Sequence, residues 1–60
     1  MITKRICDLE KGDKFIISGR EYLVINVSAV EVCVRYLHFD NADKKYFGKK
    51  SQQIVEMIKD

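Results

Sequence analysis

The sequence predicts an all-β fold, a small barrel of five strands, and three observations lead to this prediction. Seven Ile and six Val stand among the 60 residues, and β-branched residues favour strands. The pairs Gly12-Asp13 and Ser18-Gly19 are turn formers, and they bracket a short apolar segment. From Lys14 to Leu37 the side chains alternate with a period of two. The alternative is an α+β fold in which an antiparallel sheet packs under a C-terminal helix.

Chain length limits what this fold can be. The 60 residues contain no Pro, no linker-like tract and no internal repeat, so we expect one domain over residues 1–60. A domain of this size buries only about 60% of the surface of its unfolded chain, and its stability is therefore expected to be marginal. The formal net charge of +2 is too small to argue for a polyanionic partner by itself.

Charged residues interrupt positions 1–15, where a secretion signal needs an apolar core. No apolar run approaches the roughly 18 residues of a membrane span. We therefore expect a soluble, cytoplasmic protein without a membrane partner. In that compartment Cys7 and Cys33 are expected to be reduced and to fill small apolar spaces, while a disulfide between them remains an alternative.

The first predicted element is a strand over Ile2–Cys7, with Ile6 pointing inward. Residues 8–13 then turn the chain. A tight hairpin follows, with one strand over Lys14–Ser18 and a second that begins at Arg20 or Glu21 and ends at Val27. In this second strand both faces are largely apolar, which is typical of a central strand. One face carries Leu23, Ile25 and Val27, and the other carries Tyr22, Val24 and Asn26.

A third run, Val30–His38, alternates as a half-buried strand does. The turn formers at positions 40–43 follow Phe39, and Lys44–Phe47 is expected to be a short strand that ends at Gly48. One face of this longer strand is predicted to carry Val30, Val32, Val34 and Tyr36.

The last segment, Gln52–Lys59, fits two patterns. Ile54, Met57 and Ile58 have helical spacing, and Ser51 is a suitable N-cap. Val55 and Met57 also alternate with their neighbours as in a strand. We favour the strand, because it would cover an edge that a small sheet otherwise leaves open.

The spacing Leu9-x-x-Gly12-Asp13-x-Phe15, followed by Gly19-x-x-Tyr22-x-Val24, resembles the opening of SH3-like small barrels. It is similar in particular to the KOW-like N-terminal domain of translation elongation factor P, over about 16 residues (9–24). The resemblance implies that Leu9 plugs the barrel floor, that Gly12 and Asp13 make the first turn, and that Tyr22 and Val24 pack the second strand.

The chain lacks the segment that carries the function of that family. In elongation factor P a basic, glycine-rich hairpin tip carries a modified lysine, whereas here Val27 continues through Ser28-Ala29 into Val30. The resemblance therefore implies a fold and no activity, since such barrels host many unrelated functions. Barrels of this size that stand alone also resemble small proteins of phages and mobile elements.

Catalysis is not expected. His38 is the only imidazole, and strand alternation places it on the face opposite Cys33. Asp8, Glu10 and Asp13 are interpreted as a solvated turn rather than a metal site. The three glycines stand too far apart to cradle a phosphate. We expect no enzyme activity, no cofactor, no metal and no small-molecule substrate.

We expect instead a small binding or regulatory module that acts through a protein partner or a homodimer. Its surface aromatics would be Tyr22, Tyr36 and Phe39, since aromatic residues are enriched at interfaces. The alternative is nucleic-acid binding, in which lysines neutralise phosphates and aromatics stack on bases. In another interpretation Tyr46 and Phe47 are core residues and the lysines protect a strand edge from aggregation. The candidate binding residues are Lys44, Lys45, Tyr46, Phe47, Gly48, Lys49 and Lys50, extended by Arg35, Tyr36 and His38.

Overall fold

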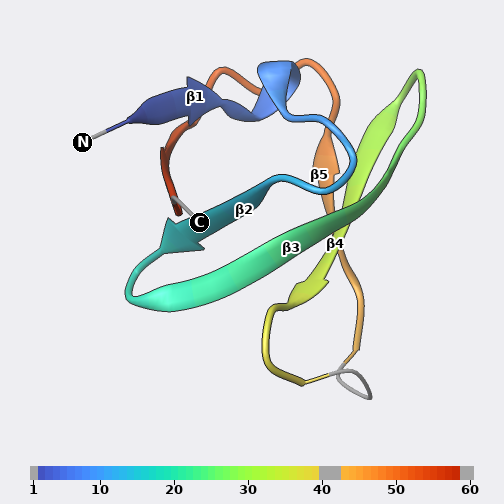
Figure 1. Cartoon of the computed structure of the whole chain (residues 1–60). Helices are drawn as coiled ribbons and strands as arrows, with labels where there is room; N and C mark the ends of the chain where they lie inside the picture. The colour runs from blue at the N-terminus through green and yellow to red at the C-terminus, as the bar shows by residue number, and fades with distance from the viewer. Residues whose placement is uncertain (1, 40–42, 59–60) are drawn as a thin grey trace.

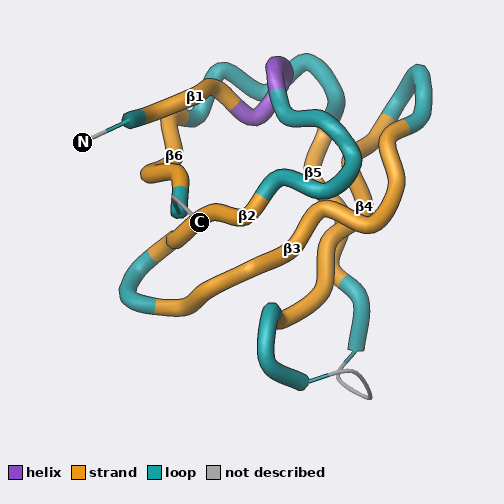
Figure 2. Tube along the Cα trace, viewed as in Figure 1, coloured by secondary structure: helices purple, strands orange, loops and turns teal. Residues whose placement is uncertain are grey.

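Antiparallel pairing joins the strands into one six-stranded sheet, in the order β1-β6-β2-β3-β4-β5. The computed structural model describes residues 2–39 and 43–58, and the sheet curls around the interior as Figures 1 and 2 show. The all-β class is thus confirmed, with six strands rather than the expected five. Its elements are β1 (Thr3–Arg5), a 3-10 turn η1 (Ile6–Asp8), β2 (Lys14–Ile17), β3 (Arg20–Val27), β4 (Glu31–Tyr36), β5 (Lys45–Gly48) and β6 (Ile54–Met57).

The N-terminal strand is shorter than expected, because the chain bends into η1 after Arg5. This bend brings two large aliphatic side chains, Ile6 and Leu9, to 0% and 2% exposure. Ile6 therefore points inward as predicted, although it lies in the 3-10 turn. The backbone N–H of Ile6 donates to the carbonyl of Gln53, at 2.9 Å, so the turn is fastened to the segment that leads into β6.

The β2–β3 hairpin follows the prediction. Ile17 pairs with Arg20, which leaves a loop of Ser18 and Gly19. Both loop residues have positive φ, 52° and 78°, as a two-residue type I′ turn requires. This turn geometry fixes the register that places Phe15 opposite Tyr22.

A register shift between Val24 and Asn26 corrects the expected pattern of β3. The extra residue of a bulge reverses the alternation beyond it. Val27 consequently packs against the core, on the same side as Val24, instead of sharing a face with Leu23 and Ile25.

The β3–β4 turn corrects a second expectation. Val30 is 75% exposed and does not share the inward face of Val32 and Val34. The Ser28 hydroxyl accepts hydrogen bonds from the backbone N–H groups of Val30 and Glu31, at 3.4 and 3.1 Å. These bonds close a turn at the tip of the hairpin, and they hold Val30 outside the sheet.

The C-terminal segment is a strand at Ile54–Met57, so the helical alternative is wrong for these residues. β6 pairs with β1 on one side and with β2 on the other, and it covers the edge of β2 as expected. Among the described residues β1 and β5 remain as the two edge strands. Of the turn predicted at residues 40–43, only Asp43 is described, and Lys59 of the predicted last element also lies outside the described residues.

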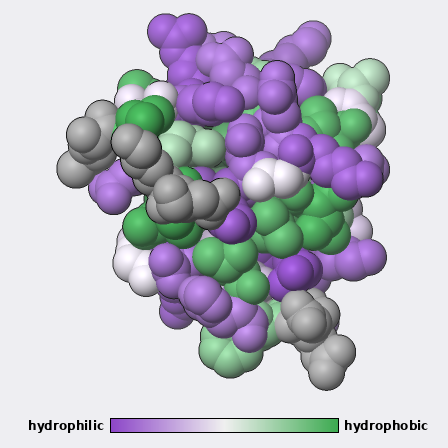
Figure 3. Space-filling view, in the orientation of Figure 1, coloured by the Kyte–Doolittle hydropathy of each residue, from purple (hydrophilic) through white to green (hydrophobic). Residues whose placement is uncertain are grey.

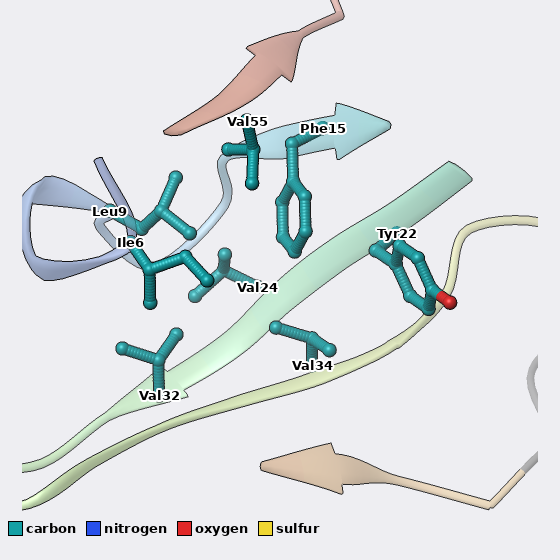
Figure 4. Close-up of a cluster of buried hydrophobic side chains, with 8 residues drawn as sticks. All are labelled: Ile6, Leu9, Phe15, Tyr22, Val24, Val32, Val34 and Val55. Atoms are coloured by element: carbon teal, nitrogen blue, oxygen red, sulfur yellow. The ribbon is translucent and has the colours of Figure 1, made fainter. Parts of the chain in front are cut away.

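The core is a single cluster of aliphatic and aromatic side chains, drawn in Figure 4. No charged or polar residue is buried among the described residues. Both cysteines are free thiols, Cys33 buried and Cys7 half-buried. No helix in the described part of the chain is long and apolar enough to cross a membrane. The core cluster consists of Ile6, Leu9, Phe15, Tyr22, Val24, Val32, Val34 and Val55.

Candidate binding site

One row of aromatic rings leads from the core to the surface. Phe15 of β2 stacks on Tyr22 of β3 at 5.4 Å between centroids, and Tyr22 stacks on Tyr36 of β4 at 5.1 Å. Phe39, just beyond β4, forms a T-shaped pair with Tyr36, with 6.5 Å between the ring centroids. The row exists because the two register pairs Phe15–Tyr22 and Tyr22–Tyr36 lie side by side on the inward face of three adjacent strands. We call Phe15, Tyr22, Tyr36 and Phe39 the aromatic row.

Exposure rises along the aromatic row. Phe15 and Tyr22 are buried, at 0% and 4% exposure. Tyr36 is half-buried, and Phe39 is 67% exposed. A large apolar ring therefore stands largely in water at the end of the row, in contact with Tyr36.

A lysine lies over the middle of this row. Lys45 Nζ is 5.6 Å from the centroid of the Tyr22 ring and 5.4 Å from that of Tyr36. Ammonium groups at this range are attracted to the negative face of an aromatic ring. Lys45 pairs with the inward-facing Val34, which explains why its side chain reaches over the inner face of β4.

The same group alters the titration of Tyr36. A hydrogen bond from Lys45 is the main cause that lowers the pKa of Tyr36 from its ordinary value of 10.0, and desolvation of the phenol partly opposes it. Hydrogen bonding to Tyr36, then to Tyr22, raises the pKa of Lys45 above 10.5. The raised pKa of Lys45 favours a charged ammonium beside Tyr36.

Arg20 supplies a second positive group at this end of the sheet. Its Nη1 donates to the hydroxyl of Tyr36 at 3.4 Å. Among the described residues the carboxylates seen with a basic partner are Asp13, paired with Lys4, and Glu21, in contact with the His38 imidazole. Neither Arg20 nor Lys45 is matched by a carboxylate within that part of the chain.

The basic and aromatic run at positions 44–50 does not form one surface, because β5 is a strand. Lys45 and Phe47 lie on the inner face, whereas Tyr46 pairs with Cys33 on the outer face. Lys49 is half-buried and donates to the backbone carbonyl of Cys7, so it fastens η1 to the chain beyond β5. Lys44 and Lys50 are exposed.

Arg35 also lies away from the aromatic row. It pairs with Leu23 on the outer face, and its Nη1 donates to the carbonyl of Tyr36 at 2.9 Å and to that of Leu37 at 3.4 Å. It stabilises the turn after β4. Tyr46, 58% exposed, lies near Cys33, and hydrogen bonding to that thiol is the main cause that raises the pKa of Tyr46.

The outer face of the sheet is partly apolar. Leu23 and Ile25 are half-buried there, beside the buried Cys33. In the view of Figure 3, hydrophobic side chains gather across the middle, over β3 and its crossing with β4, with hydrophilic ones around them. The stacked rings and the lysine above them lie on the inner face. Among the described residues, the apolar side chains of the outer face have no such arrangement.

Sequence reasoning expected Tyr22, Tyr36 and Phe39 on one surface and placed Lys45 in the lysine run, and the sheet register brings all four together. The expectation that Tyr22 lies on the surface is wrong, because its ring is packed between Phe15 and Tyr36 at 4% exposure. Sequence reasoning missed Arg20, which stands at the first position of β3. The only signal for Arg20 was its place directly after the Ser18-Gly19 turn. His38, named as an extension of the lysine run, instead contacts Glu21, with 2.8 Å between Nε2 and Oε1.

Among the described residues no group of three or more His, Cys, Asp or Glu side chains is placed to hold a metal ion. Comparison with models of known families, with curated proteins and with solved structures finds no match to this chain. Arguments about function therefore depend on the geometry of the aromatic row and its two cations.

Proposed function

We propose that this protein is a non-enzymatic binding module of the SH3-like small-barrel type, which binds a protein partner through the exposed end of the aromatic row. The barrel assignment is supported by the curl of the sheet and by the bonds that tie η1 to the chain between β5 and β6. Burial of Leu9, Tyr22 and Val24 fits the packing roles that the resemblance implies for them.

The observation that carries the proposed function is the exposure of Phe39 at 67% on a stack whose inner rings are buried. Covering a fully exposed ring of this size gains about 1.5–3 kcal/mol of transfer free energy. Because Tyr36 already orients the ring, little side-chain entropy is lost when a partner packs on it. Such preorganised aromatic groups are typical hot spots of protein interfaces.

The arrangement favours a protein over a nucleic acid. A single strand needs several cations along its backbone and aromatic faces on the same side. Here the two most exposed aromatics, Phe39 and Tyr46, lie on opposite sides of the sheet, and Lys49 is engaged in fastening η1. The lysine run therefore offers no continuous track for phosphates.

Selection from a displayed library of random peptides tests the proposed function. The wild type is compared with Phe39→Ser and with the matched control Tyr46→Ser, an exposed aromatic of the opposite face. We expect a shared peptide class that the wild type and Tyr46→Ser select and Phe39→Ser does not. A mixed oligonucleotide is titrated in parallel at two salt concentrations.

Two results would overturn the proposed function. One is the absence of any enriched peptide class with folded wild-type protein. The other is tight oligonucleotide binding that weakens with salt and is lost when Lys44 and Lys50 are changed to Glu, which would establish the nucleic-acid alternative.

A further inference from the structure

We propose that the partner segment is acidic, with a carboxylate that binds beside the Tyr36 hydroxyl between Lys45 and Arg20 and with an adjacent apolar residue that packs on Phe39. This inference rests on the proposed function, and it adds the chemistry of the ligand. Three strands build the site, because Arg20 belongs to β3, Tyr36 to β4 and Lys45 to β5.

The first argument is charge. Arg20 and Lys45 both lie around the one ring of Tyr36, at 3.4 Å from its oxygen and 5.4 Å from its centroid. Within the described part of the chain no carboxylate neutralises either of them. Two neighbouring cations without a counter-charge attract an anion and repel a cationic ligand.

The second argument is the hydrogen-bonding capacity of the Tyr36 hydroxyl. A phenol has one proton to donate and lone pairs that accept. Arg20 donates to the oxygen, and the hydrogen bonds of Lys45 and Tyr22 with Tyr36 lower its pKa, as bonds donated to the phenol oxygen do. A carboxylate oxygen placed beside the hydroxyl would accept from it and from both cations, which gives short, charge-assisted bonds. The lowered pKa of Tyr36 also indicates surroundings that favour negative charge.

The third argument is the size of the positive region. Glu21 follows Arg20 directly in the chain and pairs with His38 at 2.8 Å. The two cations at Tyr36 therefore have an acidic residue close by in the chain. This arrangement fits one or two carboxylates of a peptide and opposes the repeated phosphates of a nucleic acid.

The apolar part of the ligand follows from the geometry of Phe39. Its ring and that of Tyr36 are T-shaped, at an interplanar angle of 84°, and Phe39 remains 67% exposed. An apolar or aromatic residue next to the acidic one can cover the exposed ring while the carboxylate reaches the cations.

The amino-acid content of the peptides selected from the same random displayed library tests this inference. The double variant Arg20→Gln/Lys45→Gln is compared with Lys44→Gln/Lys50→Gln, which removes the same charge from exposed positions outside the site. We expect Asp and Glu to be enriched severalfold in the pools of the wild type and of the control pair, and to return to the input frequency with Arg20→Gln/Lys45→Gln.

A direct titration supplies the second measurement. A labelled ten-residue peptide of alternating Glu and Leu is compared with its Gln and Leu counterpart by fluorescence anisotropy. Removal of either cation is expected to weaken binding of the acidic peptide about fivefold. This is the effect of losing one exposed ion pair whose free energy lies near the upper end of the usual range. Tyr36→Phe, which keeps the ring and removes the hydroxyl, is also expected to weaken binding of the acidic peptide. The Gln peptide is expected to be indifferent to all three changes.

The outcomes separate the two proposals. An enriched peptide class without acidic residues, or equal affinity for the Glu and Gln peptides, overturns the acidic ligand and leaves the protein-binding function standing. Equal loss of acidic enrichment in both double variants also overturns it, because the effect is then one of net charge. Failure to select any peptide with folded wild-type protein removes the proposed function and this inference together.

Discussion

Lys45 Nζ lies 5.4 Å from the centre of the Tyr36 ring, on the neighbouring strand, and 5.6 Å from the Tyr22 ring one strand further on. The contact spans β3, β4 and β5 on the inner face of the sheet. It depends on the inward alternation of Lys45 with Phe47, since Tyr46 between them faces outward. A shift of β5 by one residue would replace the cation by Lys44 or Tyr46.

The alkaline titration of the tyrosines tests this contact. The pKa of Tyr36 is lowered, chiefly by its hydrogen bond from Lys45, and that of Tyr46 is raised, chiefly by Cys33. We expect Tyr36 to ionise below pH 10.0 and Tyr46 above it, as followed by the tyrosine ring carbon resonances. Lys45→Gln is expected to raise the pKa of Tyr36 and leave Tyr46 unchanged. Ionisation of Tyr46 before Tyr36 would contradict the arrangement.

The lowered pKa of Tyr36 also makes the free energy of unfolding depend on pH. Because the folded-state pKa of Tyr36 lies below its unfolded value of about 10, its ionisation adds stability as pH rises towards that value. The raised pKa of Lys45 acts in the opposite sense, since its contribution is complete below its unfolded pKa and is lost as pH rises through the folded one. We therefore expect the urea midpoint to rise less in Lys45→Gln than in the wild type as the pH approaches 10, because Arg20 and Tyr22 alone then lower the pKa of Tyr36, while the Lys44→Gln control keeps the full rise.

Two isoleucines test the packing of the core. Ile6 is 0% exposed in η1, and Ile54 is 64% exposed in β6. Ile6→Ala is expected to lower the free energy of unfolding by about 2–5 kcal/mol. Ile54→Ala is expected to change it by less than about 0.5 kcal/mol. Urea unfolding followed by circular dichroism measures both, and equal losses would show that η1 does not plug the interior.

Two glycines test the hairpin turn. Gly19 has φ of 78°, whereas Gly48 has no positive φ, and neither has a neighbour within 4 Å of an added Cβ. Gly19→Ala is expected to lower the free energy of unfolding by about 1–2 kcal/mol through backbone strain alone. Gly48→Ala is expected to be neutral or slightly stabilising. Similar effects at both positions would argue against the two-residue turn.

A lysine pair separates a structural role from a binding role within positions 44–50. Lys49 donates to the carbonyl of Cys7, and Lys50 is exposed. Lys49→Gln is expected to lower the free energy of unfolding by about 1 kcal/mol, because the carbonyl loses its partner in a half-buried place. Lys50→Gln is expected to have no effect on thermal unfolding. The reverse order would show that Lys49 is not part of the closure around η1.

Much of this fold could be predicted from local patterns in the sequence. The β2–β3 hairpin followed from Ser18-Gly19 and the flanking β-branched residues, and the shared face of Val32, Val34 and Tyr36 followed from alternation. The bulge after Val24 could not be predicted, since nothing in the sequence there marks an extra residue. It reversed the predicted side of Val27.

The candidate site shows the same limit. Aromatic and basic residues are recognised one by one, but the row depends on which residues stand opposite each other across strands. Tyr22 meets Tyr36 only through the register of β3 and β4, and that register is set by turns and packing rather than by either residue. Arg20 could not be assigned to Tyr36, because 16 positions separate them in the chain.

The proton chemical shifts of the Lys45 side chain report most directly whether the cation lies over both tyrosine rings. Protons held above aromatic faces at this range are shifted upfield by ring currents. We predict upfield-shifted Lys45 ε-methylene resonances, with cross-peaks to the Tyr22 and Tyr36 rings, and loss of the shift in Tyr36→Leu. Lys45 resonances at the position of a solvated lysine, the same as those of Lys50, would contradict the site and the acidic ligand inferred from it.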